Sequence, residues 1–218
     1  MLSSVSCLLF PASFERRSEV SVVPSCVDRV EGTGIPVRGD NIDTDRIIPA
    51  RFLKAITFDG LGDHLFEDDR AVTAEHPFSN PAYQHARVLL VNENFGSGSS
   101  REHAPQALKR WGIEACVGES FSEIFRGNSL AIGLACVTVT YEEVDRLMAA
   151  VERTPSMRLV LSLRDRTLEA AGRQMPVGIE GSVRDALLTG TWDATGMLVD
   201  DFDVVRGVAS RIPYIRGF

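Results

Sequence analysis

The chain has 218 residues, of which 44% are hydrophobic and 24% are charged, and its formal charge is −7 at pH 7. A chain of this length can bury a substantial core as one domain, or as one domain with an appendage. The negative charge argues against a nucleic-acid-binding surface, and no apolar run approaches the length that spans a membrane.

The first 26 residues differ from the rest of the chain. The apolar run at 5–10 is short and lacks a basic segment before it, which argues against a secretory signal. The serines and arginines partly fit a transit peptide, whereas Glu15 and Glu19 count against one. We expect residues 1–26 to be a disordered tail, with a mispredicted start codon as the alternative. We expect a single domain over 27–218 and a cytoplasmic protein.

The first half of that domain contains few regular elements. The sequence predicts a β segment over 27–37, a polar turn over 38–45 and a short helix over 47–55, in which Pro49 must be an early helical residue. Residues 57–84 are then predicted to be irregular. A loop of that length inside a compact domain is usually functional or disordered.

The second half alternates between strand and helix patterns. The predicted elements are a strand over 86–92, a helix over 102–111, a strand over 113–118, a helix over 120–129, a strand over 135–140 and a helix over 141–152. This alternation predicts an α/β fold with some parallel pairing. A hairpin-like pair over 157–163 and 167–170 follows, and then helices over 182–188 and 200–208.

Candidate functional residues are concentrated in the segment NFGSGSSREHAP, residues 94–105. A predicted strand runs into a loop of small residues, and a helix begins at Glu102. Small residues let a ligand approach the backbone, and the amides at a helix start favour an anion. Arg101 adds a planar cation suited to a carboxylate. The segment therefore predicts a site for a small carboxylic acid, unless Ser99 or Ser100 only caps the helix.

Other motif interpretations find no support. The segment lacks the glycine spacing of a dinucleotide site, the Gly-Lys-Ser/Thr of a phosphate loop and the Gly-x-Ser-x-Gly of a hydrolase elbow. The four cysteines form no C-x-x-C pair, and an iron–sulfur cluster usually needs three or four thiolates. Cys116 and Cys136 lie in predicted buried strands, as inert core thiols. We expect this chain to bind no metal itself.

Four segments together resemble a known family. GSGSSREHAP (96–105), GDNIDTDRIIPARFLK (39–54), ESFSEIFRGNSLAIGL (119–134) and LLTGTWDATGMLV (187–199) are similar, in order, to the hallmark segments of 3-isopropylmalate dehydratase small subunits. That family is related to the mobile swivel domain of aconitase. The resemblance covers the chain from about Val30 to its end.

The resemblance implies a fold and a reaction. The fold is α/β, a three-layer β/β/α swivelling domain with a C-terminal helical extension. The reaction is the isomerisation of 2-isopropylmalate to 3-isopropylmalate through isopropylmaleate, in leucine biosynthesis. A [4Fe–4S] cluster with one open iron acts as the Lewis acid, and a partner large subunit carries it. The small subunit is then active only with that large subunit.

The resemblance also implies residue roles. The base is the first serine of the S-S-R triplet, here Ser99, and its anion would be stabilised by helix amides and Arg101 in the manner of an oxyanion hole. Ser100 and Arg101 hold the substrate, and Gly98 lets it approach the backbone. His103 has no visible orienting carboxylate, so a packing or supporting role is expected for it.

A second set of candidates lies upstream. Thr44 and Asp45 match an active-site Thr-Asp pair of aconitases, with Thr44 at the substrate and Asp45 in catalysis; the alternative is a solvated, aspartate-rich turn. Arg46 and Arg51 could contact a carboxylate, and residues 54–62 would discriminate between substrates.

Two other functions remain open at this point. Ser97, Gly127, Cys136 and Ala194 depart from the common family pattern. Related two-subunit enzymes act on homoaconitate, methylmalates or dimethylmalate, so another 2-hydroxy acid is the alternative substrate. A non-catalytic anion-binding module is the alternative of a different class.

Overall fold

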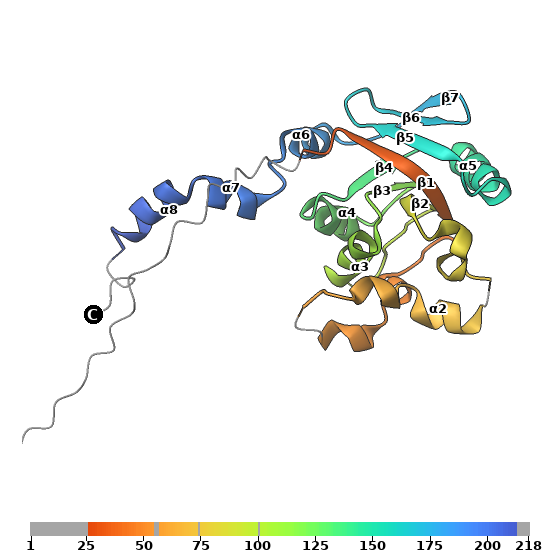
Figure 1. The fold of residues 1–218 in the computed structure, drawn as a ribbon, viewed down its shortest axis with the longest axis horizontal. Coiled ribbons are helices and arrows are strands. Elements are labelled where there is room, and N and C mark those ends of the chain that lie inside the picture. The colour runs from red at the N-terminus through yellow and green to blue at the C-terminus, as the bar shows by residue number, and fades with distance from the viewer. Residues whose placement is uncertain (1–25, 55–56, 74, 100, 213–218) are drawn as a thin grey trace, which may run out of the picture.

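The structure of this chain, a computed structural model, describes residues 26–54, 57–73, 75–99 and 101–212 (Figure 1). The prediction of a disordered tail over 1–26 therefore lies outside the described residues, apart from Cys26.

Among these residues, seven strands form one mixed sheet in the order β4-β3-β2-β1-β5-β6-β7. Strands β1 to β4 pair in parallel, and β1, β5, β6 and β7 pair antiparallel. Helices lie against the curled sheet (Figure 1), which confirms the α/β class. The strands are β1 (Arg29–Val37), β2 (Ala86–Val91), β3 (Ala115–Gly118), β4 (Ala135–Thr138), β5 (Arg158–Ser162), β6 (Thr167–Ala170) and β7 (Arg173–Pro176). The sequence pattern missed β7.

The helices between the parallel strands are α3 (His103–Trp111) and α4 (Glu123–Leu130), and α5 (Tyr141–Arg153) follows β4. Helix α4 begins three residues later than predicted, because the Ser122 side chain accepts a hydrogen bond from the Phe125 amide and caps it there. Thr140 caps α5 in the same way. The apolar face predicted for α5 is confirmed by four buried residues, Val144, Leu147, Met148 and Val151.

The helix predicted over 47–55 is wrong. The structure has helix α1 over Thr44–Ile47 and a separate 3-10 helix, η1, over Ala50–Lys54. Helix α1 begins early because the Asp43 side chain accepts a hydrogen bond of 2.8 Å from the Arg46 amide. Pro49 lies between the two helices. Because proline has no backbone N–H to donate, α1 cannot continue through it.

Residues 57–84 are more regular than predicted. They contain η2 (Leu61–His64), α2 (Glu67–Val72), η3 (Pro77–Ser79) and η4 (Pro81–Tyr83). Five of their side chains join the hydrophobic core: Leu61, Leu65, Phe66, Phe78 and Tyr83. This segment is therefore part of the folded body.

Three helices form the C-terminal extension, α6 (Gly181–Thr189), α7 (Ala194–Asp200) and α8 (Phe202–Ala209). Buried Leu187 anchors α6, and its carbonyl accepts a hydrogen bond from the Val27 amide. Helices α7 and α8 extend away from the body (Figure 1). In the described structure, six of the nine exposed large hydrophobic side chains lie here: Met197, Leu198, Phe202, Val204, Val205 and Val208. No described helix is long and apolar enough to cross a membrane.

Candidate functional site

Three loops meet beyond the carboxyl ends of the parallel strands β1, β2 and β3. Backbone hydrogen bonds run from Gly96 to Ile42 (2.8 Å) and from Phe95 to Ser120 (3.1 Å). The Ser122 hydroxyl donates to the Gly96 carbonyl over 2.6 Å. In open parallel sheets this edge is the usual place for a ligand. Three of the four family-like segments are thus brought together here, although they lie far apart in the sequence.

The glycine loop is shaped by two residues with positive φ. Gly96 has a φ of +75° and Gly98 a φ of +91°, a region that favours glycine. A side chain at Gly96 would overlap the Phe125 ring, so that ring lies directly against the loop. Ser99 follows Gly98 and is exposed. The predicted residue Ser100 lies outside the described part of the chain.

Arg101 and Asp45 form an ion pair between the guanidinium Nη1 and the carboxylate Oδ1. The Arg101 side chain is 16% exposed and that of Asp45 is 50% exposed. The structure therefore places the downstream candidates, Ser99 and Arg101, beside the upstream segment that carries Thr44 and Asp45.

Thr44 and Asp45 are placed differently, although they are adjacent in α1. Thr44 is 2% exposed. Its amide donates to the Ser97 carbonyl over 2.9 Å, and its hydroxyl donates to the Ser99 carbonyl over 3.1 Å. Asp45 instead reaches the surface beside Arg101. Neither residue has the fully solvated environment of an ordinary polar turn.

Helix capping does not account for Ser99. The N-cap of α3 is Glu102, which makes no side-chain capping bond, and the helix begins within one residue of its predicted start. Its first residue, His103, contacts the Phe58 ring edge-on, with 5.1 Å between ring centroids. The Arg110 guanidinium lies over the same ring. These contacts give His103 the packing role that we expected, and they hold residue 58 of the segment 54–62 against α3.

Arg46 and Arg51 already have carboxylate partners on α2. Arg46 pairs with Asp69 at 2.9 Å, and Arg51 pairs with Glu67 and Asp68 at 2.6 and 2.7 Å. The Arg51 guanidinium holds the pKa of both of its partner carboxyls below their usual range. These acidic partners were not foreseen, because nothing in the local pattern of 67–69 indicates which arginine the helix will meet.

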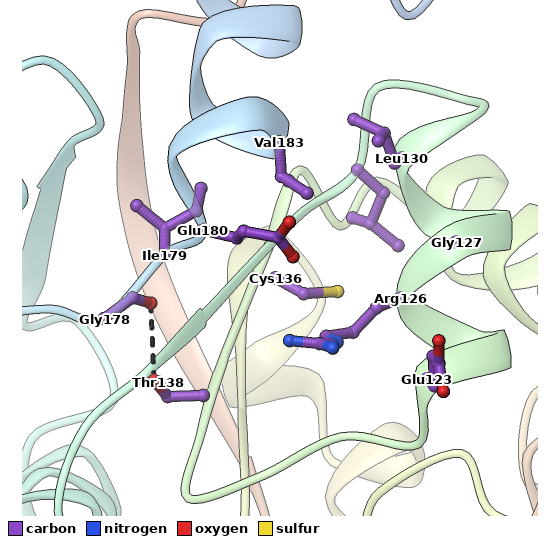
Figure 2. Close-up of a pocket in the computed structure, with 11 residues that line it drawn as sticks. Glu123, Arg126, Gly127, Leu130, Cys136, Thr138, Gly178, Ile179, Glu180 and Val183 are labelled. Atoms are coloured by element: carbon purple, nitrogen blue, oxygen red, sulfur yellow. Dashed lines mark hydrogen bonds between the residues drawn. The ribbon is translucent and has the colours of Figure 1, made fainter.

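A cavity of about 310 Å³ lies between α4 and α6 (Figure 2). The Cys136 sulfur points into it, and Arg126, Glu123 and Glu180 stand around it (Figure 2). None of the candidate site residues lines this cavity.

The described residues offer no ligand set for a metal. No three or more histidine, cysteine, aspartate or glutamate side chains are grouped there so as to hold an ion. Cys116 and Cys136 are neighbours on β3 and β4, but a cluster would need at least one further thiolate beside them. An iron–sulfur cluster does not fit these residues.

Comparisons with known proteins show the family to which the sequence and fold are similar. A family model described as the aconitase C-terminal domain matches residues 25–142. The chain is 47% identical over 193 residues to the 3-isopropylmalate dehydratase small subunit of Synechocystis sp., covering 88% of this chain and 96% of that one. It is 44% identical to the small subunit from Thermus thermophilus, over 86% and 95% of the two chains. The solved 3-isopropylmalate dehydratase structure from Methanocaldococcus jannaschii has a similar fold, with a TM-score of 0.63 and 22% identity over 82% of this chain and 98% of that one.

Proposed function

This chain belongs to the family of 3-isopropylmalate dehydratase small subunits, and we propose from this membership that it is one subunit of a two-subunit hydro-lyase of leucine biosynthesis. The enzyme would interconvert 2-isopropylmalate and 3-isopropylmalate through isopropylmaleate. The single observation that carries the proposal is the ion pair of Arg101 with Asp45, which joins two family-like segments beside Ser99. A carboxylic-acid substrate suits that arrangement.

Ser99 is the proposed base. Ser99 stands on an exposed loop, next to Gly98, which is also exposed and has a positive φ. As an alkoxide, it would take the proton from the carbon beside the one that carries the hydroxyl group, and it would return the proton during rehydration. A serine alkoxide needs a nearby positive charge, and Arg101 supplies it two residues away.

Arg101 is the proposed substrate clamp. Its guanidinium offers several parallel donors, which match a carboxylate in two-point geometry. Asp45 would hold the arginine extended until a substrate carboxylate arrives. Ser100 would add a hydroxyl to the substrate, and Gly98 would keep the approach clear.

The partner is proposed to be the large subunit, which would hold a [4Fe–4S] cluster, since the described residues of this chain do not fit one. Such a cluster supplies a Lewis acid for the departing hydroxyl group. This chain's contribution is then to bind the carboxylates, to orient the substrate and to move the proton at Ser99. We also propose that the pair works in the cytoplasm.

The test is an anaerobic assay with 2-isopropylmalate, using this chain alone and mixed with the cluster-loaded large subunit of the same organism. Activity only in the mixture is the expected result. Ser99→Ala should abolish turnover while the complex still forms, and Ser182→Ala, a serine on α6, should leave turnover unchanged. If the mixture forms a complex but turns over another 2-hydroxy acid in place of 2-isopropylmalate, the proposed substrate is wrong. If the Ser99→Ala complex is active, Ser99 is not the base.

A further inference from the structure

We propose that Thr44 is a positioning residue, which aims the Ser99 hydroxyl by holding the backbone on both sides of Gly98 and does not itself touch the substrate. The proposal rests on the proposed role of Ser99 as the base. It differs from the role that family resemblance suggests for Thr44, which is direct substrate contact.

Two hydrogen bonds from one residue carry the inference. The Thr44 amide donates to the Ser97 carbonyl over 2.9 Å, and the Thr44 hydroxyl donates to the Ser99 carbonyl over 3.1 Å. The two acceptors are the residues immediately before and after Gly98. Thr44 therefore holds the backbone at Ser97 and at Ser99. A rotation of the backbone at Gly98, which would turn the Ser99 side chain, would break one of these two bonds.

Gly98 makes such a clamp necessary. Its φ is +91°, and a glycine reaches this conformation and many others at little cost. The backbone of Gly98 cannot by itself hold Ser99 in one direction. The direction must come from contacts on either side of it, and the bonds from Thr44 are placed there.

Thr44 is itself firmly placed. It is the first residue of α1, Asp43 caps that helix, and the Thr44 carbonyl accepts a bond of 3.0 Å from the Ile48 amide. Its branched side chain has few rotamers, and it is 2% exposed. A buried hydroxyl that already donates its proton to the Ser99 carbonyl is not free to donate to a substrate.

Thr44 and its neighbour act as a pair. Asp45 holds the Arg101 side chain, while Thr44 holds the Ser99 backbone. One short helix thus positions the two ends of the Ser-Ser-Arg triplet. A displacement of about 1 Å in a catalytic group can lower a rate about 100-fold, so loss of the Thr44 hydroxyl should act on turnover.

The test compares two substitutions in the reconstituted enzyme. Thr44→Val keeps the shape and removes the hydroxyl, and it should lower kcat by about tenfold or more while KM changes by less than about threefold. Thr44→Ser keeps the hydroxyl and should restore most of the turnover. Thr189→Val is the matched control, because the Thr189 hydroxyl also donates to a backbone carbonyl, that of Asp185, but on α6. It should leave kcat and KM unchanged.

Several results would overturn the proposal. A rise in KM with unchanged kcat in Thr44→Val would indicate substrate contact, and equal losses in Thr44→Ser and Thr44→Val would indicate a packing role. Thr44→Val should also leave substrate binding to the inactive Ser99→Ala complex unchanged, and weaker binding there would show that Thr44 acts on the substrate and not through Ser99. If Thr44→Val does not fold, Thr44→Ala is measured in the same way. An active Ser99→Ala enzyme would instead refute the proposed base, whatever Thr44 does.

Discussion

Asp45 and Arg101 are 56 residues apart in the chain, yet the carboxylate of one accepts a hydrogen bond from the guanidinium of the other. The arginine is mostly covered, whereas the aspartate is half exposed. A pair that is open to water on one side contributes at most about 1 kcal/mol to stability. Its structural effect is to fix where the Arg101 guanidinium lies, next to the serine loop.

The first prediction concerns that guanidinium. Arg101→Lys should raise KM for the carboxylic-acid substrate about tenfold or more, because an ammonium cannot make the two-point contact of a guanidinium. Steady-state kinetics of the reconstituted enzyme measure this. Arg46→Lys, at an arginine paired with Asp69, is the control and should leave KM unchanged. Equal rises in both variants would show that Arg101 has no special role.

The second prediction concerns the turn at Gly96. Gly96→Ala should lower the free energy of unfolding by about 2–4 kcal/mol, because it adds a methyl group against the Phe125 ring to the cost of a positive φ. Gly60→Ala is the control, since Gly60 has nearly the same φ, +74°, and no atom within 4 Å of an added methyl group. It should cost only about 1–2 kcal/mol. Denaturant unfolding of the isolated chain measures both, and similar values would refute the close contact with Phe125.

The third prediction concerns pH. His76 is buried against Phe66 and Phe78, and this burial lowers its pKa below the ordinary value near 6.5; the nearby Asp69 carboxylate opposes the shift more weakly. The unfolded chain then binds more protons than the folded one below that pH, so stability falls as the pH falls. The free energy of unfolding should therefore decrease from pH 7.5 to 5.5.

Asparagine at position 76 tests this explanation. The His76 ring nitrogen accepts a hydrogen bond from the Phe78 amide, and asparagine can accept the same bond without titrating. His76→Asn should therefore show a smaller fall over this pH range than the native chain. His85→Asn, at an exposed histidine, should keep the native fall. If the free energy of unfolding of His76→Asn falls as much as that of the native chain, groups other than His76 cause the decrease.

The fourth prediction concerns the thiols. Hydrogen bonding to Cys136 and burial raise the pKa of the Cys116 thiol, whereas Cys26 is exposed and Cys136 opens into the cavity between α4 and α6. In a Cys7→Ser variant, a maleimide should label Cys26 first, Cys136 slowly, and Cys116 only after unfolding. Peptide mass spectrometry gives the order. Labelling of Cys116 in the native chain would contradict its burial.

Much of this protein was predictable from the sequence by itself. The alternation of β2, α3, β3, α4, β4 and α5 follows from local hydrophobic periodicity, which needs no knowledge of distant contacts. The serines and Arg101 became candidates through the local chemistry of residues 94–105, whereas Asp45, and Ser99 as the base, became candidates through the family resemblance. The buried face of α5 was predicted for the same reason.

Other features were decided by tertiary structure. The core position of residues 57–84, the pairing of Arg46 and Arg51 with α2 and the addition of β7 all depend on what lies opposite a segment in space. The same holds for Thr44, whose sequence neighbours indicate a polar turn, while its buried hydroxyl meets a carbonyl 55 residues away. A sequence pattern reports a residue's own periodicity and capping, and the partner of a hydrogen bond or an ion pair is fixed only when the chain folds.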